Sequence, residues 1–366
     1  MKYYIIAGEA SGDLHASNLM KALQQKDANA DFRFWGGDLM QAVGGTLVKH
    51  YKERAFMGFG EVIMNLPTIL GLFKFCKQDI TKYNPDQLIF IDNSGFNLRI
   101  AKWAKQHSFK TNYYIAPQVW ASRASRVKDI KRDIDNMFVT LPFEEDFYKK
   151  YNYKVNFVGH PLLDEIEGRK PIDDTTFRKE HNLSDKKIIA LLPGSRKQEI
   201  NKMLSVMLKM ADEFHEFQFV IAGAPSQDFE FYQQFIKTEN VKFISNKTYD
   251  LLSISYAALV TSGTATLEAA LFKVPEVVCY KGSWLSYQIA KRIITLKYIS
   301  LVNLIMDREV VTELIQNDFN EKRLKQELLK ILDDQYRQEI FGDYYDLEQK
   351  LGGAGASENA AKLIAG

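Results

Sequence analysis

The sequence predicts an α/β protein made of two doubly wound parallel sheets that follow one another along the chain and face a shared cleft. Three observations support this fold class. Short apolar segments alternate with helical segments, which is typical of parallel strands covered by helices. The alternation stops once, after residue 161, and then begins again. The length of 366 residues also exceeds that of a typical single core.

The expected elements follow this alternation. In the first domain the apolar strands are expected at residues 3–7, 32–35, 87–91, 111–115, 136–139 and 156–158. A polar, charged stretch at 167–174 is typical of a linker, so the expected domains are 1–167 and 168–366. Strands of the second domain are expected at 187–192, 217–222, 241–244, 257–260 and 276–279. From residue 285 onward the chain is expected to be mainly helical, and its last helices are candidates for packing back on the first domain.

Composition excludes several classes of protein. Hydrophobic residues make up 46% of the chain and charged residues 26%, which is typical of a globular protein. The net charge of +2 offers no whole-protein argument for nucleic-acid binding. Cys76 and Cys279 lie in apolar runs, as expected for buried thiols in a reducing compartment. The short apolar N-terminus does not resemble a signal peptide, and no stretch qualifies as a spanning helix, so we expect a cytoplasmic protein.

Ligands of doubly wound sheets bind outside the carboxyl ends of the strands, so the residues just after each strand are the candidates for a site. The first strand leads into the segment GEASGD at 8–13, in which Glu9, Ser11 and Asp13 supply polar atoms beside two glycines. This spacing lacks the G-x-G-x-x-G pattern of dinucleotide binding. A plain turn with a capping acid explains the same residues.

Asp92 follows the strand 87–91, and Asn97 lies just before a helix that is expected to start near Leu98. A carboxylate at the end of a buried strand is held rigidly and partly desolvated, which suits a general base. The alternative is that Asp92 caps that helix.

Two strand ends of the second domain are typical of anion sites. One carries Gly194, Ser195 and Arg196, and the other carries Ser262, Gly263 and Thr264 before an alanine-rich helix. Unpaired N–H groups at a helix start bind phosphate, and arginine engages phosphate oxygens bidentately. Glu268, in the first turns of that helix, is suited to accept hydrogen bonds from ribose hydroxyls. The two helix starts together suit a diphosphate and its ribose better than a lone phosphate. An ordinary capped helix with a solvent-facing Glu is the alternative for 262–268.

Metal and nucleophile patterns are weak. Asp133 and Asp135 match an Asp-x-Asp motif but lie at the edge of a basic helix rather than after a strand. The six histidines show no ligand spacing, and no nucleophile elbow is present. We therefore expect neither a metal nor a cofactor.

Taken in order, the motifs resemble those of the lipid A disaccharide synthases. The matching blocks lie at 8–13, 57–62, 91–92 with 96–97, 116–121, 141–144, 158–160, 191–196 and 262–268, and so span nearly the whole chain. Ser122 stands where the family often has a second Trp, and Val302 precedes Asn303 where a Pro is common. Both departures concern loop shape rather than a charged group.

The resemblance implies an inverting, metal-independent glycosyltransferase of the GT-B architecture, with two Rossmann-like domains. Such an enzyme joins UDP-2,3-diacylglucosamine to 2,3-diacylglucosamine 1-phosphate, giving the β-1,6-linked disaccharide 1-phosphate and UDP. Asp92 would take the proton from the 6-hydroxyl of the acceptor, while Arg196 and the helix start at 262–264 stabilise the leaving diphosphate. Asn303 would line the same pocket. Members of the family can be dimers with exchanged C-terminal segments, so a monomer or a homodimer is expected.

Acylated substrates also give the apolar segment 56–76 a purpose. This segment has more apolar residues around the helix than one core-facing side needs. We therefore predict that it contacts the inner leaflet of the membrane. The residues expected to do so are Val62, Leu66, Ile69, Leu70, Leu72 and Phe73. An ordinary core helix is the alternative.

Three other functions remain open on the residues alone. A different UDP-sugar enzyme of the same architecture, such as a 2-epimerase, would not need the apolar segment. A non-catalytic nucleotide sensor would not depend on Asp92. A nicotinamide dehydrogenase is disfavoured by the missing glycine pattern.

Overall fold

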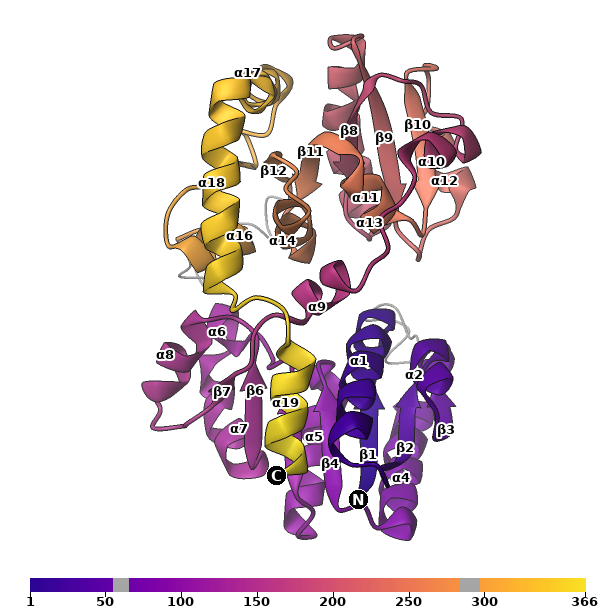
Figure 1. The fold of residues 1–366 in the computed structure, drawn as a ribbon, viewed down its shortest axis with the longest axis vertical. Helices are drawn as coiled ribbons and strands as arrows, with labels where there is room; N and C mark the ends of the chain where they lie inside the picture. Colours follow the sequence, from indigo (N-terminus) through magenta and orange to yellow (C-terminus); the bar gives the residue numbers. More distant parts are fainter. Residues whose placement is uncertain (55–65, 283–296) are drawn as a thin grey trace. The chain divides into compact units, whose positions relative to one another are not determined.

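The computed structural model describes residues 1–54, 66–282 and 297–366. Its contacts divide the chain into two compact units, Met1–Asp164 with Leu351–Gly366, and Glu165–Lys350. The sequence placed the boundary at residue 167 and made the last helices candidates for packing back on the first domain. In the structure the last sixteen residues belong to the first unit (Figure 1).

The first unit contains a seven-stranded parallel sheet with the strand order β3-β2-β1-β4-β5-β6-β7. Its strands are β1 (Lys2–Ala7), β2 (Asp31–Gly36), β3 (Thr46–His50), β4 (Gln87–Ile91), β5 (Thr111–Tyr114), β6 (Asn136–Val139) and β7 (Asn156–Phe157). Its helices are α1 (Ala10–Lys26), α2 (Asp38–Val43), α4 (Leu66–Tyr83), α5 (Ser94–Gln106), α6 (Val119–Ser122), α7 (Val127–Asp133), α8 (Phe143–Lys149) and α19 (Ala356–Ala365), with short 3-10 turns at Tyr51–Arg54 and Ala124–Arg126.

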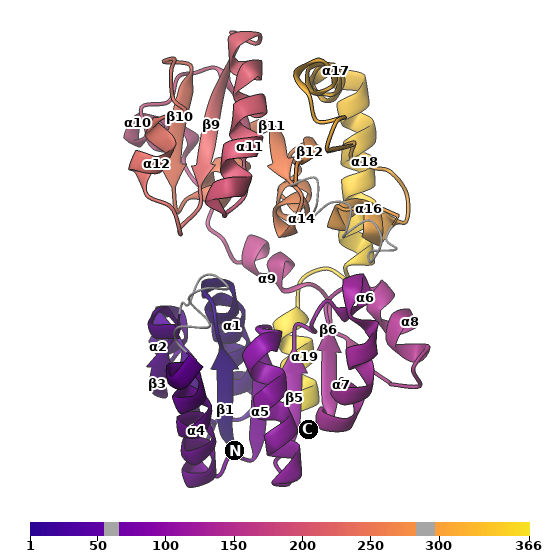
Figure 2. The ribbon, with the colours of Figure 1, turned by 180° about the vertical axis from the view of Figure 1, so that it is seen from behind.

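Alternate residues of each strand point to opposite faces, so the sheet has a core on both sides. On one face Tyr3 and Ile5 of β1 pack against α1 and α19. On the other face Tyr4 and Ile6 pack against α4, α5 and α7. Figures 1 and 2 show these two helical layers from opposite sides.

A single carboxylate fixes the start of α19. Asp164 lies in α9 (Pro161–Glu167), and its carboxylate accepts hydrogen bonds from the backbone N–H groups of Gly355, Ala356 and Ser357 at 2.6, 3.0 and 2.9 Å. Ile364 is buried in the core that α19 shares with α1. The C-terminal helix is therefore a built-in layer of the first unit.

The second unit contains a six-stranded parallel sheet with the order β10-β9-β8-β11-β12-β13. Its strands are β8 (Lys187–Leu192), β9 (Phe217–Gly223), β10 (Val241–Ser245), β11 (Ser255–Thr261), β12 (Glu276–Tyr280) and β13 (Glu313–Ile315). Its helices are α10 (Asp174–Glu180), α11 (Lys197–Met207), α12 (Phe229–Gln233), α13 (Thr248–Ser253), α14 (Thr264–Leu271), α16 (Leu301–Met306), α17 (Glu321–Leu332) and α18 (Asp334–Lys350), with a 3-10 turn at Leu208–Asp212.

Two strands, β3 and β13, were not predicted from the sequence. Each lies at the edge of its sheet, and β13 is only three residues long. Because one side of an edge strand has no neighbour, such strands lack the continuous apolar run that marks the buried ones. The other strands coincide with the predicted segments to within a few residues.

Each sheet has one point at which the chain reverses the direction in which strands are added. In the first unit this topological switch point lies between β1 and β4, and in the second it lies between β8 and β11. Crevices at switch points are where doubly wound sheets bind ligands. The loops after these four strands carry Glu9, Asp92, Ser195 and Thr264, so the strand order brings the predicted residues together in pairs.

Candidate functional site

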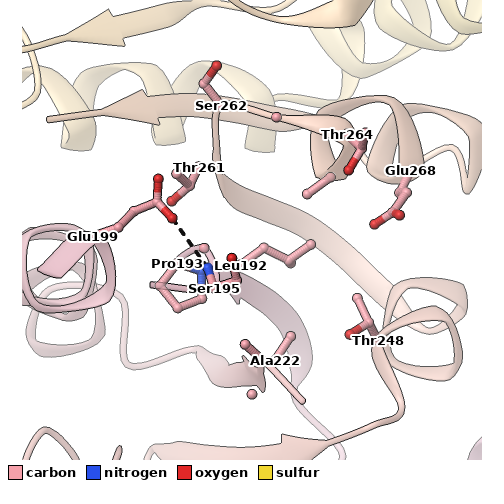
Figure 3. A pocket seen from close by; sticks show the side chains of 15 residues that line it. Leu192, Pro193, Ser195, Glu199, Ala222, Thr248, Thr261, Ser262, Thr264 and Glu268 are labelled. Carbon is pink, nitrogen blue, oxygen red and sulfur yellow. Dashed lines mark hydrogen bonds between the residues drawn. The ribbon is translucent and has the colours of Figure 1, made fainter. Parts of the chain in front are cut away.

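A pocket of about 250 Å³ opens at the switch point of the second unit. It is formed by the ends of β8, β9 and β11 and the starts of α11, α13 and α14 (Figure 3). Its wall is made of small and polar residues, namely Leu192, Pro193, Gly194, Ser195, Glu199, Ala222, Gly223, Ala224, Thr248, Thr261, Ser262, Gly263, Thr264, Ala265 and Glu268.

The turn after β8 requires a glycine. Gly194 has φ +94°, and a Cβ at this position would lie 2.3 Å from Oε2 of Glu199. That same oxygen accepts a hydrogen bond from the backbone N–H of Ser195 at 3.3 Å (Figure 3). Glu199 therefore caps the start of α11 from within the helix. Its carboxylate is part of the pocket wall, although the anion site predicted at this loop did not include it.

The start of α14 forms the opposite wall. Gly263 is its N-cap and makes no side-chain cap bond, so the first N–H groups of this helix remain available to a ligand. Nearby, the Oγ1 atom of Thr261 is buried without a hydrogen-bond partner among the described residues. Ser262 is oriented differently, because its hydroxyl donates to the carbonyl of Ile299 at 2.8 Å. Backbone donors and Thr261 thus face the pocket, while the Ser262 side chain anchors a neighbouring loop.

Glu268 provides a second carboxylate of this pocket. The hydroxyl of Tyr249 donates to its Oε1 at 3.2 Å, which fixes the orientation of the carboxylate. Burial raises the pKa of Glu268, and the bond from Tyr249 opposes part of that rise. A fixed acceptor at the rim of a small polar pocket is suited to bind the hydroxyls of a sugar.

Two residues predicted for this pocket are not among its lining residues. Arg196 is exposed at the N-cap of α11 and is not among the lining residues. Asn303 is buried in α16, and its side chain is used within the fold. Its amide nitrogen donates to Val311 O and Glu313 Oε1 at 2.8 and 2.9 Å, and its oxygen accepts from the N–H groups of Val310 and Val311. Asn303 therefore braces the segment that leads to β13.

In the first unit the loops after β1 and β4 touch at the switch point. A Cβ on Gly8 would lie 1.8 Å from the side-chain nitrogen of Asn93, so only glycine leaves room for that contact. Asp92 and Asn93 both have φ +42°, a left-handed conformation that costs a non-glycine residue about 1–3 kcal/mol. Hydrogen bonds to the Asp92 carbonyl from Tyr113 and Asn97 hold this backbone in place.

The carboxyl group of Asp92 is exposed beyond the end of β4. The protein atoms around it remove part of its hydration and raise its pKa, and the nearby charge of Glu9 raises the pKa further. A carboxylate whose pKa is raised binds a proton more readily. This is the property that a general base needs.

The other residues predicted around Asp92 have separate positions. Glu9 and Ser11 are exposed at the start of α1. Asn97 is buried, and its amide donates to the carbonyls of Ile6, Ile91 and Asp92, which ties β1 to β4. Asp13 is buried and accepts from the N–H groups of Gly37, Leu39 and Met40, which makes it the cap of α2. Of these four residues, only Glu9 and Ser11 are open to a ligand.

The Asp-x-Asp segment is engaged in ion pairs. Both carboxylate oxygens of Asp133 accept from Arg132, at 2.6 and 2.5 Å, while Asp135 pairs with Lys105 and accepts from Thr111. Across residues 1–54, 66–282 and 297–366, no group of three or more His, Cys, Asp or Glu side chains is arranged to hold a metal ion.

The predicted membrane stripe is only partly described. Val62 lies outside the described residues, and the structure describes the backbone of Leu66 but not its side chain. Ile69 is half-buried, whereas Leu70 is 60% exposed and Phe75 45% exposed. Leu72 and Phe73 are half-buried and pack against the core. No described helix is long and apolar enough to cross a membrane.

Sequence reasoning missed three residues of the pocket region, Glu199, Thr248 and Tyr249. Glu199 follows Arg196 at the spacing of a capping box, which is a detectable signal. Thr248 lies just after β10, as the other site residues lie just after their strands. The expectation that ligands bind beyond the carboxyl ends of the strands therefore also applies to Thr248. Tyr249 had no signal of its own, because its contact with Glu268 joins two helices that are distant in sequence.

The two parallel-sheet units, each with polar residues at its switch point, define the GT-B class of nucleotide-sugar enzymes. Solved structures of this fold include a putative UDP-N-acetylglucosamine 2-epimerase from Listeria monocytogenes (TM-score 0.68, 12% identity, covering 100% of this chain and 94% of that one). The UDP-GlcNAc 2-epimerase from Neisseria meningitidis gives a TM-score of 0.66 at 14% identity, covering 100% and 98% of the two chains. At these identities the likeness concerns the fold alone.

The chain belongs to the lipid-A-disaccharide synthetase family, whose model matches residues 3–365. It is 40% identical over 367 residues to the lipid-A-disaccharide synthase of Syntrophus aciditrophicus, covering 98% of this chain and 96% of that one. The corresponding protein of Coxiella burnetii (strain CbuG_Q212) is 36% identical over 366 residues, with the same coverage. The family that the sequence motifs indicated is thus confirmed, and with it a glycosyltransferase that forms the lipid A disaccharide.

Proposed function

We propose that the chain transfers 2,3-diacylglucosamine from UDP to the 6-hydroxyl of 2,3-diacylglucosamine 1-phosphate. The observation that carries this assignment is that the switch point of each unit has residues suited to one part of the reaction. A small polar pocket with an uncapped helix start and a fixed carboxylate suits a nucleotide, and an exposed carboxylate with a raised pKa suits a base. The second unit binds the donor in this proposal, and the first binds the acceptor.

The reaction is a single displacement. Asp92 takes the proton from the acceptor hydroxyl, whose oxygen attacks the anomeric carbon as the bond to the diphosphate breaks. One displacement inverts the anomeric configuration. The N–H groups at the start of α14 stabilise the charge that develops on the departing UDP, and Glu268 holds the ribose. We assign phosphate binding also to Arg196, which is exposed and directly follows the lining residue Ser195.

We propose that no metal takes part in this step. In other sugar-nucleotide enzymes a divalent ion neutralises the negative charge of the departing diphosphate. Here we assign that role to the start of α14 and to Arg196. The one Asp-x-Asp segment supports this assignment, because Arg132 and Lys105 engage its two carboxylates. Addition of a chelator is therefore expected to leave the rate of disaccharide formation unchanged.

Asp92→Asn tests the proposed base. We expect kcat for disaccharide formation to fall by about 10²–10⁴-fold while UDP binding is retained, because the amide has the same shape but cannot accept the proton. The wild-type rate is also expected to fall as the pH drops through the raised pKa of Asp92, since protonation removes the base. Product formation is followed with defined acylated substrates. An Asp92→Asn enzyme with wild-type kcat contradicts the proposal.

Peripheral association with the cytoplasmic face of the inner membrane is the second part of the proposal. Both substrates carry acyl chains, and the exposed Leu70 and Phe75 on α4 lie on the unit assigned to the acceptor. Two large apolar side chains on one helix are suited to enter the interfacial region of a bilayer. We leave monomer and homodimer as the two oligomeric states to be distinguished by light scattering.

A further inference from the structure

We propose that the groove between α5 and α7 binds a phosphate monoester, and that its physiological ligand is the 1-phosphate of the acceptor; this second assignment rests on the proposed function. The groove belongs to the first unit and has a volume of about 230 Å³. It is lined by Ser94, Gly95, Leu98, Arg99, Lys102, Arg126, Asp129, Ile130, Arg132 and Asp133.

The charges of the groove favour an anion. Four basic and two acidic side chains line it, which leaves a net charge of +2. Arg132 engages both carboxylates, at 3.0 Å from Asp129 and 2.5 Å from Asp133. Among the described residues, no carboxylate lies within ion-pair distance of the remaining three cations, Arg99, Lys102 and Arg126. A phosphate monoester carries about −1.5 to −2 charges at neutral pH, so it matches the groove.

The backbone adds to this preference. The first turn of α5 contributes Ser94 and Gly95 to the wall, and its N-cap residue Asn93 makes no side-chain cap bond. A Cβ on Gly95 would meet no atom within 4 Å, so the space over this turn is open. The helix start therefore presents unpaired N–H groups and the positive end of its dipole to the same groove as the three cations.

Apolar surface adjoins the charged groove. The guanidinium of Arg99 lies over the ring of Phe73 on α4, 5.7 Å from its centre, and Phe73 stacks on Phe96 with ring centres 4.6 Å apart. Leu98 and Ile130 line the groove itself. A ligand with an anionic group and attached acyl chains fits this arrangement better than a wholly polar phosphate does.

The position of the groove is consistent with the assigned chemistry. Ser94 lies two residues after Asp92, so the groove begins beside the proposed base. In a glucosamine 1-phosphate the phosphate-bearing carbon and the carbon that carries the hydroxymethyl group both adjoin the ring oxygen. An acceptor whose phosphate is held at the first turn of α5 can therefore present its 6-hydroxyl toward Asp92 without spanning the sheet.

The experiment compares two acceptors in detergent, one with the 1-phosphate and one without it, at saturating donor. For the wild type we expect kcat/KM for the acceptor to fall by about tenfold or more when the phosphate is removed. Arg126→Gln is expected to lower kcat/KM for the phosphorylated acceptor by a similar factor. The variant should therefore lose most of the discrimination between the acceptors with and without the 1-phosphate. Lys128→Gln is the matched control, because Lys128 is exposed on α7, two residues after Arg126, and does not line the groove.

Each outcome decides the assignment. Equal discrimination in Arg126→Gln and the wild type overturns it, provided that the variant melts at the wild-type temperature. Reduced binding of Arg126→Gln to phosphatidylglycerol-containing vesicles, with the discrimination intact, assigns the groove to a lipid headgroup and also overturns it. Equilibrium dialysis with inorganic phosphate tests the groove without turnover, and binding that Arg126→Gln abolishes supports it. A wild type that releases no UDP with either acceptor contradicts the proposed function, whatever the dialysis shows.

Discussion

At the scale of single residues, Glu276 of the second unit is a side chain whose burial opposes its ionisation. It begins β12, is fully buried, and neither of its carboxylate oxygens has a hydrogen-bond partner among the described residues. Burial raises its pKa well above the ordinary value, and the nearby charge of Glu313 adds to that rise. The folded protein therefore favours the protonated form of Glu276 more strongly than the unfolded chain does.

This burial predicts a specific dependence of stability on pH. Because the folded state binds the proton more tightly than the unfolded state, the contribution of Glu276 is largest below its unfolded pKa. It is lost as the pH rises toward the folded pKa. Glu276→Gln, which stays neutral, is expected to remove that decline and to raise the melting temperature of the second unit at pH 8. Calorimetry from pH 5 to 8 measures the difference, with the exposed Glu239→Gln as control. Parallel curves for wild type and Glu276→Gln would refute this account.

Asp13 has a structural position, although the sequence marks it as a candidate acceptor residue. Its carboxylate accepts three N–H groups at the start of α2. We expect Asp13→Ala to destabilise the first unit by about 1–2 kcal/mol through loss of this cap. The kcat of the folded enzyme should change by less than about threefold, because the side chain faces α2. Denaturant unfolding and steady-state kinetics check both parts. A large loss of kcat at unchanged stability would instead place Asp13 in the acceptor site.

At the scale of elements, α4 carries both packed and exposed apolar side chains. Leu72 and Phe73 pack inward against the sheet, whereas Leu70 and Phe75 remain exposed. Polar substitution of the inward pair would therefore test folding rather than membrane binding. Substitution of the exposed pair, Leu70 and Phe75, tests membrane binding instead.

We expect the double variant Leu70→Ser, Phe75→Ser to bind vesicles about tenfold or more weakly than the wild type, because burial of a large apolar side chain contributes about 1.5–3 kcal/mol. Flotation with vesicles of phosphatidylethanolamine and phosphatidylglycerol measures the partition. Leu329→Ser is the control, since Leu329 is 53% exposed on α17 of the second unit. Equal flotation of the double variant and the wild type would contradict a membrane role for α4.

At the scale of the whole molecule, the proposed function places the two substrates on separate units. Each unit has its own sheet and its own buried clusters, and the pocket with Glu268 belongs entirely to the second. A ligand that binds one folded unit stabilises that unit selectively.

UDP at 100 times its dissociation constant is therefore expected to stabilise the second unit by about 2.7 kcal/mol. The first unit should melt at an unchanged temperature. Differential scanning calorimetry with and without UDP records the two transitions. Glu268→Gln provides the comparison, because loss of the ribose-binding carboxylate should reduce the shift at the same UDP concentration. A shift confined to the first unit would reverse the assignment of substrates.

The alternation of short apolar segments with helices determined the fold class, and the small polar residues after the strands indicated where the pocket of the second unit lies. Both signals are local, since strand period, helix starts and glycine turns depend on neighbours in sequence. Glu268, Gly194 and Asp92 were predictable for this reason.

Only the tertiary structure decided which strands are neighbours and which polar side chains remain available. Strand order places β1 beside β4 and β8 beside β11, and so pairs loops that are far apart in the chain. Asp13, Asn97 and Asn303 carry suitable chemistry, but backbone groups occupy them, among them those of Gly37, Ile6 and Val310 respectively. Asp164 likewise fixes α19 to the first unit from nearly two hundred residues away. A hydrogen bond forms with whichever partner folding brings close, and that partner is not encoded in the local pattern.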